Sequence, residues 1–307
     1  MDKLMVYCLH IKIKRFPMKN TAFFKYLFAL LLFGSNGIVA SFIALGSLRI
    51  VLLRTLIGSL LLIALFFLTG GKLTFYKHKQ QFLFLAASGI AMGASWMFLY
   101  EAYARIGVGI ASLLYYCGPV IVMVLSPLLF GEKLTACKVI GFLSVLVGVF
   151  LINGNASGGG MDAFGIACGL CSALLYAAMV ICNKKAKDIV GLENATLQLF
   201  ISFLTVAVFM GATQGYAMEI PTASILPICM LGLLNTGIGC YFYFSSIGKL
   251  PVQTVAVCGY LEPLSAVLFS LVFLQESMLP AQIVGAVLIL GGAIFGEFAK
   301  KKKAEPF

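Results

Sequence analysis

Ten long apolar segments, separated by short polar gaps, run through this chain of 307 residues. A helix that crosses a bilayer needs about 20 predominantly apolar residues. With 61% hydrophobic and 11% charged residues, the chain has more apolar surface than a soluble fold of this size could bury. Continuous runs favour helices over a β-barrel, whose strands would be short and alternating. The sequence therefore predicts an all-α membrane protein with ten transmembrane helices, over residues 23–45, 50–69, 82–104, 108–129, 135–153, 163–183, 194–214, 223–246, 252–274 and 279–297.

Basic residues occupy the gaps between these segments in a one-sided pattern. With the N-terminus placed in the cytoplasm, 19 of the 22 Lys and Arg residues fall in cytoplasmic segments. Only Arg49 and Arg105 fall on the outer side, and Arg54 falls inside a predicted helix. Since basic residues collect on the cytoplasmic side of a membrane, we expect a multi-pass plasma (cell inner) membrane protein with both termini cytoplasmic. This topology accounts for the net charge of +11, so no nucleic-acid-binding face is expected.

The polar ends of the chain fit the same topology. Residues 1–22 are expected to form a basic cytoplasmic N-terminal segment, and residues 298–307 a basic cytoplasmic tail. No small-x-small cleavage site follows a short apolar core, so the first helix is expected to remain as an anchor. Whether translation starts at Met1, Met5 or Met18 is left open.

The two halves of the chain are similar to each other at an offset of 144 residues. Two segments carry most of this similarity, YYCGPVIVMVLSPLLFGEKL (115–134) and GYLEPLSAVLFSLVFLQESM (259–278). In each, a Tyr-x-x-Pro motif precedes an apolar run that ends in Glu. The matched pairs are Gly93 and Gly237, Phe98 and Phe242, Tyr116 and Tyr260, Pro119 and Pro263, Glu132 and Glu276, Gly141 and Gly285, and Gly148 and Gly292.

Each half holds five predicted helices, and an odd number places the second half in the membrane in the opposite sense. We therefore expect two inverted five-helix repeats, over residues 23–153 and 163–297. Such repeats give two near-equivalent packings that open to opposite sides, with a binding site near the midplane. The pattern favours alternating-access transport over a duplication retained only for packing.

Four segments connect this chain with a known family. They are FGSNGIVASFIA in the first helix, LRIVLLRTLIGSLLL in the second, and the later GPVIVMVLSPLLFGEKL and LEPLSAVLFSLVFLQES. Through them the chain resembles the EamA family of the drug/metabolite transporter superfamily, over residues 23–297. The resemblance implies two EamA-like five-helix repeats with both termini inside, and export of amino acids and related small metabolites. Some members of the superfamily import sugars or move nucleotide sugars, so the direction of transport stays open.

Three ionisable residues lie within the predicted helices, where charge is costly and usually faces a cavity or a partner. Glu262 lies near the middle of its helix, and no Lys or Arg is expected at a neighbouring midplane position. It could exchange a proton, bind a substrate ammonium, or form a fixed hydrogen bond to another helix. Glu101, near the outer end of the third helix, is the second candidate for proton coupling. Arg54 is either a binding residue or a side chain that extends to the outer headgroups.

Further substrate contacts are expected from aromatic and polar side chains. Trp96, Tyr100, Tyr116 and Tyr260 present large rings that could stack on an apolar or aromatic substrate, with packing as the alternative. Asn36 lies in the segment GSNG, between two glycines that leave the backbone mobile.

Paired prolines and glutamates recur in the two halves. Pro119 and Pro263 are the helix-kink candidates, because a proline ring removes one backbone hydrogen bond and displaces a carbonyl. These kinks could flex during transport, or they could serve packing alone. Glu132 and Glu276 are expected to cap the following helices or to accept hydrogen bonds from loop amides.

Together these features predict a secondary transporter for a small metabolite, with amino-acid or related metabolite efflux as the leading interpretation. The alternatives are an uptake carrier for a metabolite or sugar and, in a different class, a channel or a receptor-like membrane protein. The sequence has no GxSxG or HExxH motif and no His within a predicted helix, so no enzyme activity, metal site or cofactor is expected. The expected partners are a small-molecule substrate and the lipid bilayer, without nucleic acid, and a homodimer is left open.

Overall fold

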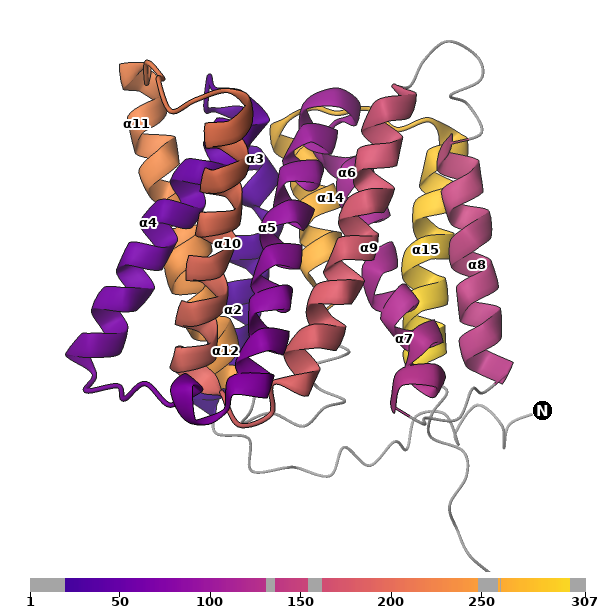
Figure 1. Ribbon diagram of the computed structural model, residues 1–307. Coiled ribbons are helices and arrows are strands. Elements are labelled where there is room, and N and C mark those ends of the chain that lie inside the picture. The colour runs from indigo at the N-terminus through magenta and orange to yellow at the C-terminus, as the bar shows by residue number, and fades with distance from the viewer. Residues whose placement is uncertain (1–19, 131–135, 154–161, 248–258, 260, 299–307) are drawn as a thin grey trace, which may run out of the picture.

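The computed structural model describes residues 20–130, 136–153, 162–247, 259 and 261–298, and every regular element in these ranges is a helix (Figure 1). This confirms the predicted all-α class for that part of the chain. The elements are α2 (Asn20–Gly34), α3 (Asn36–Ser41), α4 (Ser47–Leu68), the 3₁₀ turn η1 (Phe75–Lys77), α5 (Lys79–Ile106), α6 (Val108–Tyr115), α7 (Cys117–Phe130), α8 (Ala136–Asn153), α9 (Ala163–Lys185), α10 (Gly191–Thr213), α11 (Thr222–Cys229), the π-helix η3 (Met230–Ile238), α12 (Gly239–Ile247), α14 (Leu261–Phe273) and α15 (Pro280–Phe298).

Six helical segments in the described chain are long and apolar enough to cross a membrane. They are Thr21–Ser41, Ser47–Leu68, Lys79–Ile106, Ala163–Lys185, Gly191–Thr213 and Thr222–Tyr243. The other four predicted spans coincide with shorter apolar helices, over Val108–Val122, Val139–Gly148, Leu261–Phe273 and Pro280–Gly292. The protein is therefore a helical membrane protein.

The two ends of the bundle differ in charge. The basic end, at the bottom of Figure 1, carries the connections 69–78 and 186–190, while the far end carries Gly107 and the connections 214–221 and 274–279. At the basic end the buried carboxylate of Glu193 accepts hydrogen bonds from the hydroxyl of Thr74 (2.6 Å) and the backbone N–H of Phe75 (2.9 Å). These donors lie at the start of η1, and Glu193 lies in the first turn of α10. The hydrogen bonds therefore connect the segment before α5 with the start of α10.

The first predicted span is interrupted at Ser35, between α2 and α3, and ends at Ser41. The predicted span at residues 23–45 is thus present as the membrane-length segment Thr21–Ser41, but it is interrupted and it ends earlier than predicted. The Ser35 hydroxyl and the side-chain amide of Asn235 both donate to the carbonyl of Leu32, at 2.8 and 2.7 Å. Side-chain donors thus satisfy a carbonyl next to the break, which lets the helix axis change there.

A second interruption, at Tyr116, separates α6 from α7. Pro119 is the third residue of α7, and Pro263 lies in α14. The first turn of a helix needs no N–H donor, so a proline at this position starts a helix without disturbing it. At Pro119 the predicted kink is thus replaced by a break three residues earlier.

Glu276 supplies the cap for the N-terminus of α6. Its two carboxylate oxygens accept hydrogen bonds from the backbone N–H groups of Val108 (2.7 Å) and Gly109 (2.9 Å). A carboxylate at this position satisfies two free donors and complements the helix dipole. Glu276 therefore caps a helix of the other half, not the following helix, while its counterpart Glu132 lies outside the described residues.

Helices α8 and α15 run antiparallel, side by side, at one edge of the bundle (Figure 1). A Cβ atom added at Gly148 would lie 2.6 Å from the carbonyl oxygen of Gly285, and one at Gly292 would lie 2.7 Å from that of Gly141. The hydroxyl of Ser144 donates to the carbonyl of Leu288 at 3.0 Å. Only glycine permits such close approach of two helix backbones.

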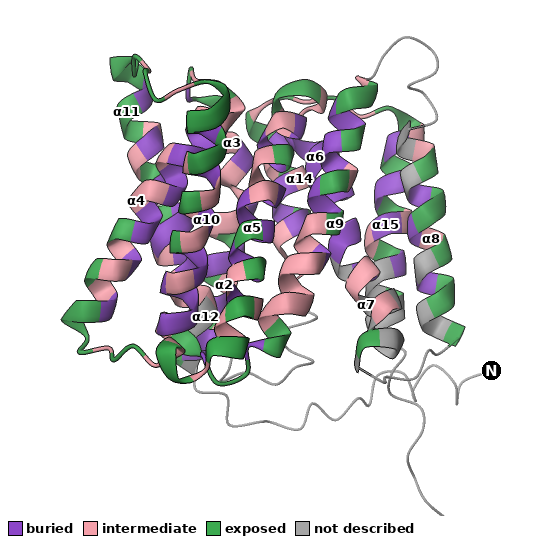
Figure 2. Cartoon of the chain, viewed as in Figure 1, coloured by how far each residue is buried: buried purple, intermediate pink, exposed green. Residues whose placement is uncertain are grey.

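The surfaces of these helices that face away from the bundle are apolar. Leu143 and Phe150 on α8 and Val287 on α15 are exposed, as are apolar residues on α4 and α10 (Figure 2). In a bilayer these side chains contact lipid, so their exposure carries no cost there.

Candidate functional site

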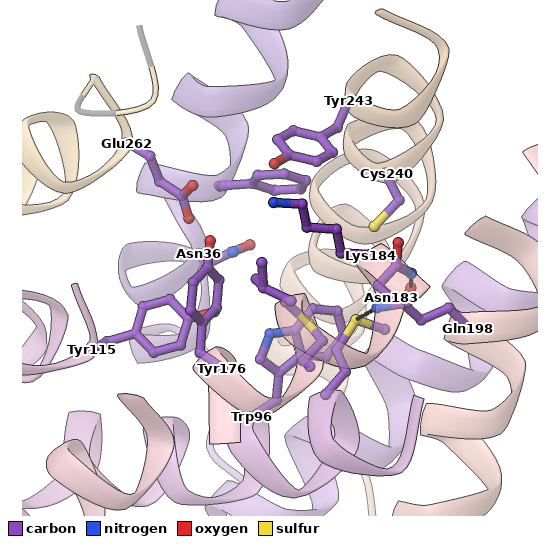
Figure 3. Close-up of a pocket in the computed structure, with 14 residues that line it drawn as sticks. Asn36, Trp96, Tyr115, Tyr176, Asn183, Lys184, Gln198, Cys240, Tyr243 and Glu262 are labelled. Carbon is purple, nitrogen blue, oxygen red and sulfur yellow. Dashed lines mark hydrogen bonds between the residues drawn. The ribbon is translucent and has the colours of Figure 1, made fainter. Parts of the chain in front are cut away.

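A cavity of about 370 Å³ lies inside the bundle (Figure 3). Side chains from α2, α3, α5, α6, α9, α10, α12 and α14 form its walls. Much of the lining is apolar or aromatic, from Phe33, Met92, Trp96, Tyr115 and Tyr176. A volume of this size lies within the range of about 300–1,000 Å³ that is usual for small-molecule sites.

Opposite charges line this cavity. Glu262 enters from α14, and Lys184 enters from the last turn of α9, with its ammonium directed into the cavity on the side of Glu262 (Figure 3). The expectation that no Lys or Arg lies near Glu262 is therefore wrong. Helix α9 continues to Lys185 at the basic end, and a lysine side chain is long enough to extend back into the cavity. Since Lys184 is itself an exposed residue, the cavity reaches the basic end.

A chain of amides forms the wall near Lys184. The Asn183 side-chain amide donates to Asn194 (3.0 Å) and to Gln198, and the Gln198 amide donates to the sulfur of Met92 (3.4 Å). Asn183 and Gln198 line the cavity, and Gln198 is buried. This network fixes polar groups between α9, α10 and α5, and it leaves neutral donors and acceptors beside the charged pair.

Arg54 is the largest fully buried side chain described, with 1% of its surface exposed. Its Nε donates to the hydroxyl of Thr236 (3.0 Å), and a terminal nitrogen donates to the hydroxyl of Tyr100. The guanidinium also lies over the rings of Trp96 (4.4 Å) and Tyr100 (5.0 Å). These contacts exclude the alternative that Arg54 extends to lipid headgroups, because the side chain is enclosed by protein.

The Arg54 contact has a counterpart in the other half of the chain. At the offset of 144 residues Arg54 corresponds to Gln198, and Met92 corresponds to Thr236. Arg54 donates to Thr236, and Gln198 donates to Met92. Each half therefore sends one polar side chain to the equivalent position of the opposite half.

A smaller space, the polar chamber, adjoins the cavity and has a volume of about 20 Å³. Glu262, Asn36 and Trp96 line both spaces, whereas Arg54 and Ser112 line the chamber only. In the described structure three buried oxygen atoms of the chamber have no hydrogen-bond partner: Asn36 Oδ1, Ser112 Oγ and Tyr116 Oη. A buried polar group left without a partner costs about 1–3 kcal/mol. The chamber is therefore a small polar space whose oxygen atoms can form further hydrogen bonds.

Glu101 is not among the residues that line the cavity or the chamber. Its carboxylate accepts a hydrogen bond from Arg105 (2.7 Å), which also donates to Asp162 (2.7 Å) at the far end. The Arg105 guanidinium holds the pKa of Asp162 below its usual range, with help from the N–H groups of Phe164 and Gly165. Glu101 thus belongs to an exposed ionic cluster, which makes it a weaker candidate for coupling than Glu262.

The structure brings most of the other sequence-based candidates together. Glu262, Asn36 and Trp96 lie at the junction of the cavity and the chamber, and Arg54 and Tyr116 line the chamber. Tyr100 is buried and contacts the chamber indirectly, by its hydrogen bond to Arg54. Tyr260 lies outside the described residues.

Lys184, Asn183 and Ser112 are among the polar residues of the site that escaped sequence reasoning. Lys184 was assigned to a basic connection by its charge, although the helix continues through it, and Asn183 ended the predicted span without being singled out. Ser112 gives no signal in a sequence, because its role depends on what surrounds it. Within the described ranges no group of three His, Cys, Asp or Glu residues could hold a metal ion.

Comparison with known proteins gives consistent results. The model of the EamA-like transporter family matches residues 20–154 and 163–296. The uncharacterized transporter YxxF of Bacillus subtilis (strain 168) is 26% identical over 295 residues, which cover 93% of this chain and 92% of that protein. The threonine/homoserine exporter RhtA of Escherichia coli (strain K12) is 25% identical over 258 residues, with 82% of each chain covered. A solved crystal structure shares the fold, with a TM-score of 0.63 and 18% identity over 90% of this chain and 96% of that one.

Proposed function

Because the chain belongs to the EamA-like transporter family, we propose that it is a secondary transporter that moves a small metabolite across the membrane by alternating access. The cavity that contains both Glu262 and Lys184 is the observation that carries this proposal. It has the size of a small-molecule site and is lined mainly by apolar and aromatic groups, with a few polar groups that would orient a ligand.

The substrate class proposed is amino acids or related zwitterions. A half-buried carboxylate and an ammonium that line the same cavity complement a ligand with one positive and one negative group, and such a ligand adds no net charge to the site. One relative, 25% identical, is named a threonine/homoserine exporter, which supports the same class. In this proposal Glu262 binds the substrate ammonium, Lys184 binds its carboxylate, and Asn36 and Trp96 contact the rest.

The architecture proposed is ten transmembrane helices in two inverted repeats, over residues 23–153 and 163–297. It is supported by two hydrogen bonds that the repeat offset relates to each other. Arg54 of the first half donates to Thr236 of the second, and their counterparts, Gln198 of the second half and Met92 of the first, form the equivalent hydrogen bond. Both termini are proposed to lie in the cytoplasm, with the protein in the plasma membrane. The cavity then opens toward the cytoplasm, which corresponds to one of the two states that alternating access requires.

Reconstitution of the purified protein in liposomes tests the function. Vesicles preloaded with one unlabelled amino acid are expected to accumulate the same labelled amino acid transiently and saturably. Glu262→Ala is expected to abolish this counterflow, because the ammonium partner is lost. Glu219→Ala, which removes an exposed carboxylate at the far end, serves as the matched control.

The same assay separates the alternatives. A channel conducts labelled solute only down its gradient, so it would equilibrate the label without a transient overshoot. An uptake carrier for sugars would show counterflow with sugars and none with any amino acid. Counterflow that is identical in wild type and Glu262→Ala would remove the cavity from the transport pathway.

A further inference from the structure

The polar chamber lies between the cavity and the far end of the bundle. Along α5, the cavity touches Met92 and Trp96, whereas the chamber touches Trp96, Leu99 and Tyr103, which are closer to the far end. Glu262 lines both spaces, so its carboxylate forms part of the boundary between them. The chamber also lies beside two helix interruptions, since Asn36 follows the break at Ser35 and Tyr116 is the break before α7.

The size and the lining of the chamber match bound water. A cavity needs about 10–15 Å³ to hold one water molecule, and the chamber offers about 20 Å³. The Ser112 hydroxyl, on a residue that is 1% exposed, lies beside Tyr103, and the Tyr116 hydroxyl lies beside the Glu262 carboxylate. Together with Asn36 Oδ1 and the Glu262 carboxylate, these hydroxyls provide the two to four polar partners that a buried water requires.

The charges around Glu262 favour water over a cation. Arg54 lines the chamber and is not within ion-pair distance of any carboxylate in the described ranges, so its positive charge opposes a metal ion there. Lys184 adds a second positive charge on the cavity side. The remaining titratable groups that face Glu262 are weak acids on α5, α6, α9, α12 and the break at Tyr116: Tyr103, Tyr115, Tyr116, Tyr176, Cys240 and Tyr243.

We propose that the polar chamber holds an ordered water molecule that links Glu262 to the far end of the transport path, and that Glu262 exchanges its proton through this water. The proposal rests on the transport function above. A proton from the far-end medium passes to the water, and the water donates a proton to the Glu262 carboxylate. On the cavity side the protonated carboxyl returns that proton to the cytoplasmic solution, so one proton enters while substrate leaves.

Filling the chamber tests this proposal. Ser112→Val places a methyl group in the space and removes a hydroxyl, so it should displace the water. The measured quantity is the ratio of substrate flux with an inward pH gradient to flux at equal pH. Wild type is expected to give a ratio above one, and Ser112→Val a ratio close to one. Ser59→Val, at another buried serine that lines neither space, is expected to keep the wild-type ratio.

Infrared spectroscopy gives a second measurement that does not depend on flux. The C=O stretching band of protonated Glu262 is identified by its loss in Glu262→Gln. Both Ser112→Val and the milder Ser112→Ala should shift this band to higher frequency, because the carboxyl loses or weakens its hydrogen bond to water. A band that stays in place in both variants overturns the proposal, as does a wild-type pH ratio in Ser112→Val. Absence of counterflow in wild type would instead overturn the proposed function.

Discussion

At the residue scale, Arg54 is the group whose burial is hardest to explain by packing alone. A guanidinium enclosed in a membrane protein must have its donors and its charge accommodated locally. Here Thr236 and Tyr100 accept hydrogen bonds, while the rings of Trp96 and Tyr100 lie against the charge. Tyr100 therefore contributes twice, as a hydroxyl acceptor and as an aromatic face.

We predict that Tyr100→Phe lowers the free energy of unfolding by about 2 kcal/mol, the value typical of a hydrogen bond to a charged group. The phenylalanine keeps the ring and removes only the acceptor for Arg54. The change is measured by heating the protein in detergent and recording how much monodisperse protein remains at each temperature. Tyr216→Phe is the control, since its hydroxyl donates to the Ala207 carbonyl at an exposed position. Equal shifts for the two variants would contradict the assigned role of Tyr100.

Sequence reasoning at this scale singled out Glu262, which lines the cavity, but did not single out Lys184, which lines it too. An acidic residue in the middle of an apolar run is visible in a sequence, because its solvation cost does not depend on the fold. Glu101 was the second candidate, and its hydrogen bond to Arg105, one helical turn further on, places it in the ion cluster at the far end. Lys184 looked like a loop residue, because no sequence pattern shows where a long side chain extends.

At the element scale, close helix contacts depend on which side of a helix each glycine faces. Adjacent glycines in α15 illustrate this: a Cβ at Gly292 would meet the Gly141 carbonyl at 2.7 Å, whereas one at Gly291 would have no atom within 4 Å. Hydropathy treats the two residues identically. Only the packing of α8 against α15 distinguishes them.

Gly292→Ala is expected to destabilise the protein by about 1–3 kcal/mol, because the added methyl group forces two helix backbones apart. Gly291→Ala is expected to be neutral or slightly stabilising, since alanine favours a helix and meets nothing there. The difference in thermal midpoint between these two variants is the measurement. If Gly292→Ala were as stable as Gly291→Ala, α8 and α15 would not pack as closely as described.

The interruptions at Ser35 and Tyr116 show why element boundaries were harder to predict than element existence. Hydropathy registers a continuous apolar run through both positions, so single helices were predicted. The break at Ser35 is supported by Asn235, a residue about 200 positions later in the chain. A local sequence pattern cannot reveal a contact between residues so far apart in the chain. Gly34 and Pro119, which lie close to the two interruptions, are nevertheless residue types that often accompany helix ends.

At the scale of the whole molecule, charge asymmetry between the two ends makes the orientation testable. The basic end is proposed to be cytoplasmic. We predict that Lys187→Cys, in a variant without other cysteines, is protected from an impermeant thiol reagent in intact cells. Glu219→Cys at the far end should be labelled. Both positions are exposed on the protein, so accessibility within the protein does not bias the comparison. The reverse pattern would invert the orientation.

The helical class and the family could be predicted from the sequence alone, because apolar run length and the repeated motifs are local features. The cavity could be predicted only in part. Its central members Glu262, Asn36 and Trp96 were identified, but the chamber depends on three side chains that converge from separate helices. Their lack of partners is a property of the assembled bundle, which no single segment encodes.

The antiparallel contact between α8 and α15 has an evolutionary consequence. The hydroxyl of Ser144 donates a hydrogen bond to the carbonyl of Leu288, its own counterpart at the offset of 144 residues. Gly148 approaches Gly285, and the equivalent pair, Gly292 and Gly141, makes the same close contact. Because these contacts pair equivalent positions of the two halves, exchanging the roles of α8 and α15 would leave the same contacts in place. This symmetry is what an origin in two copies of one ancestral segment would leave behind.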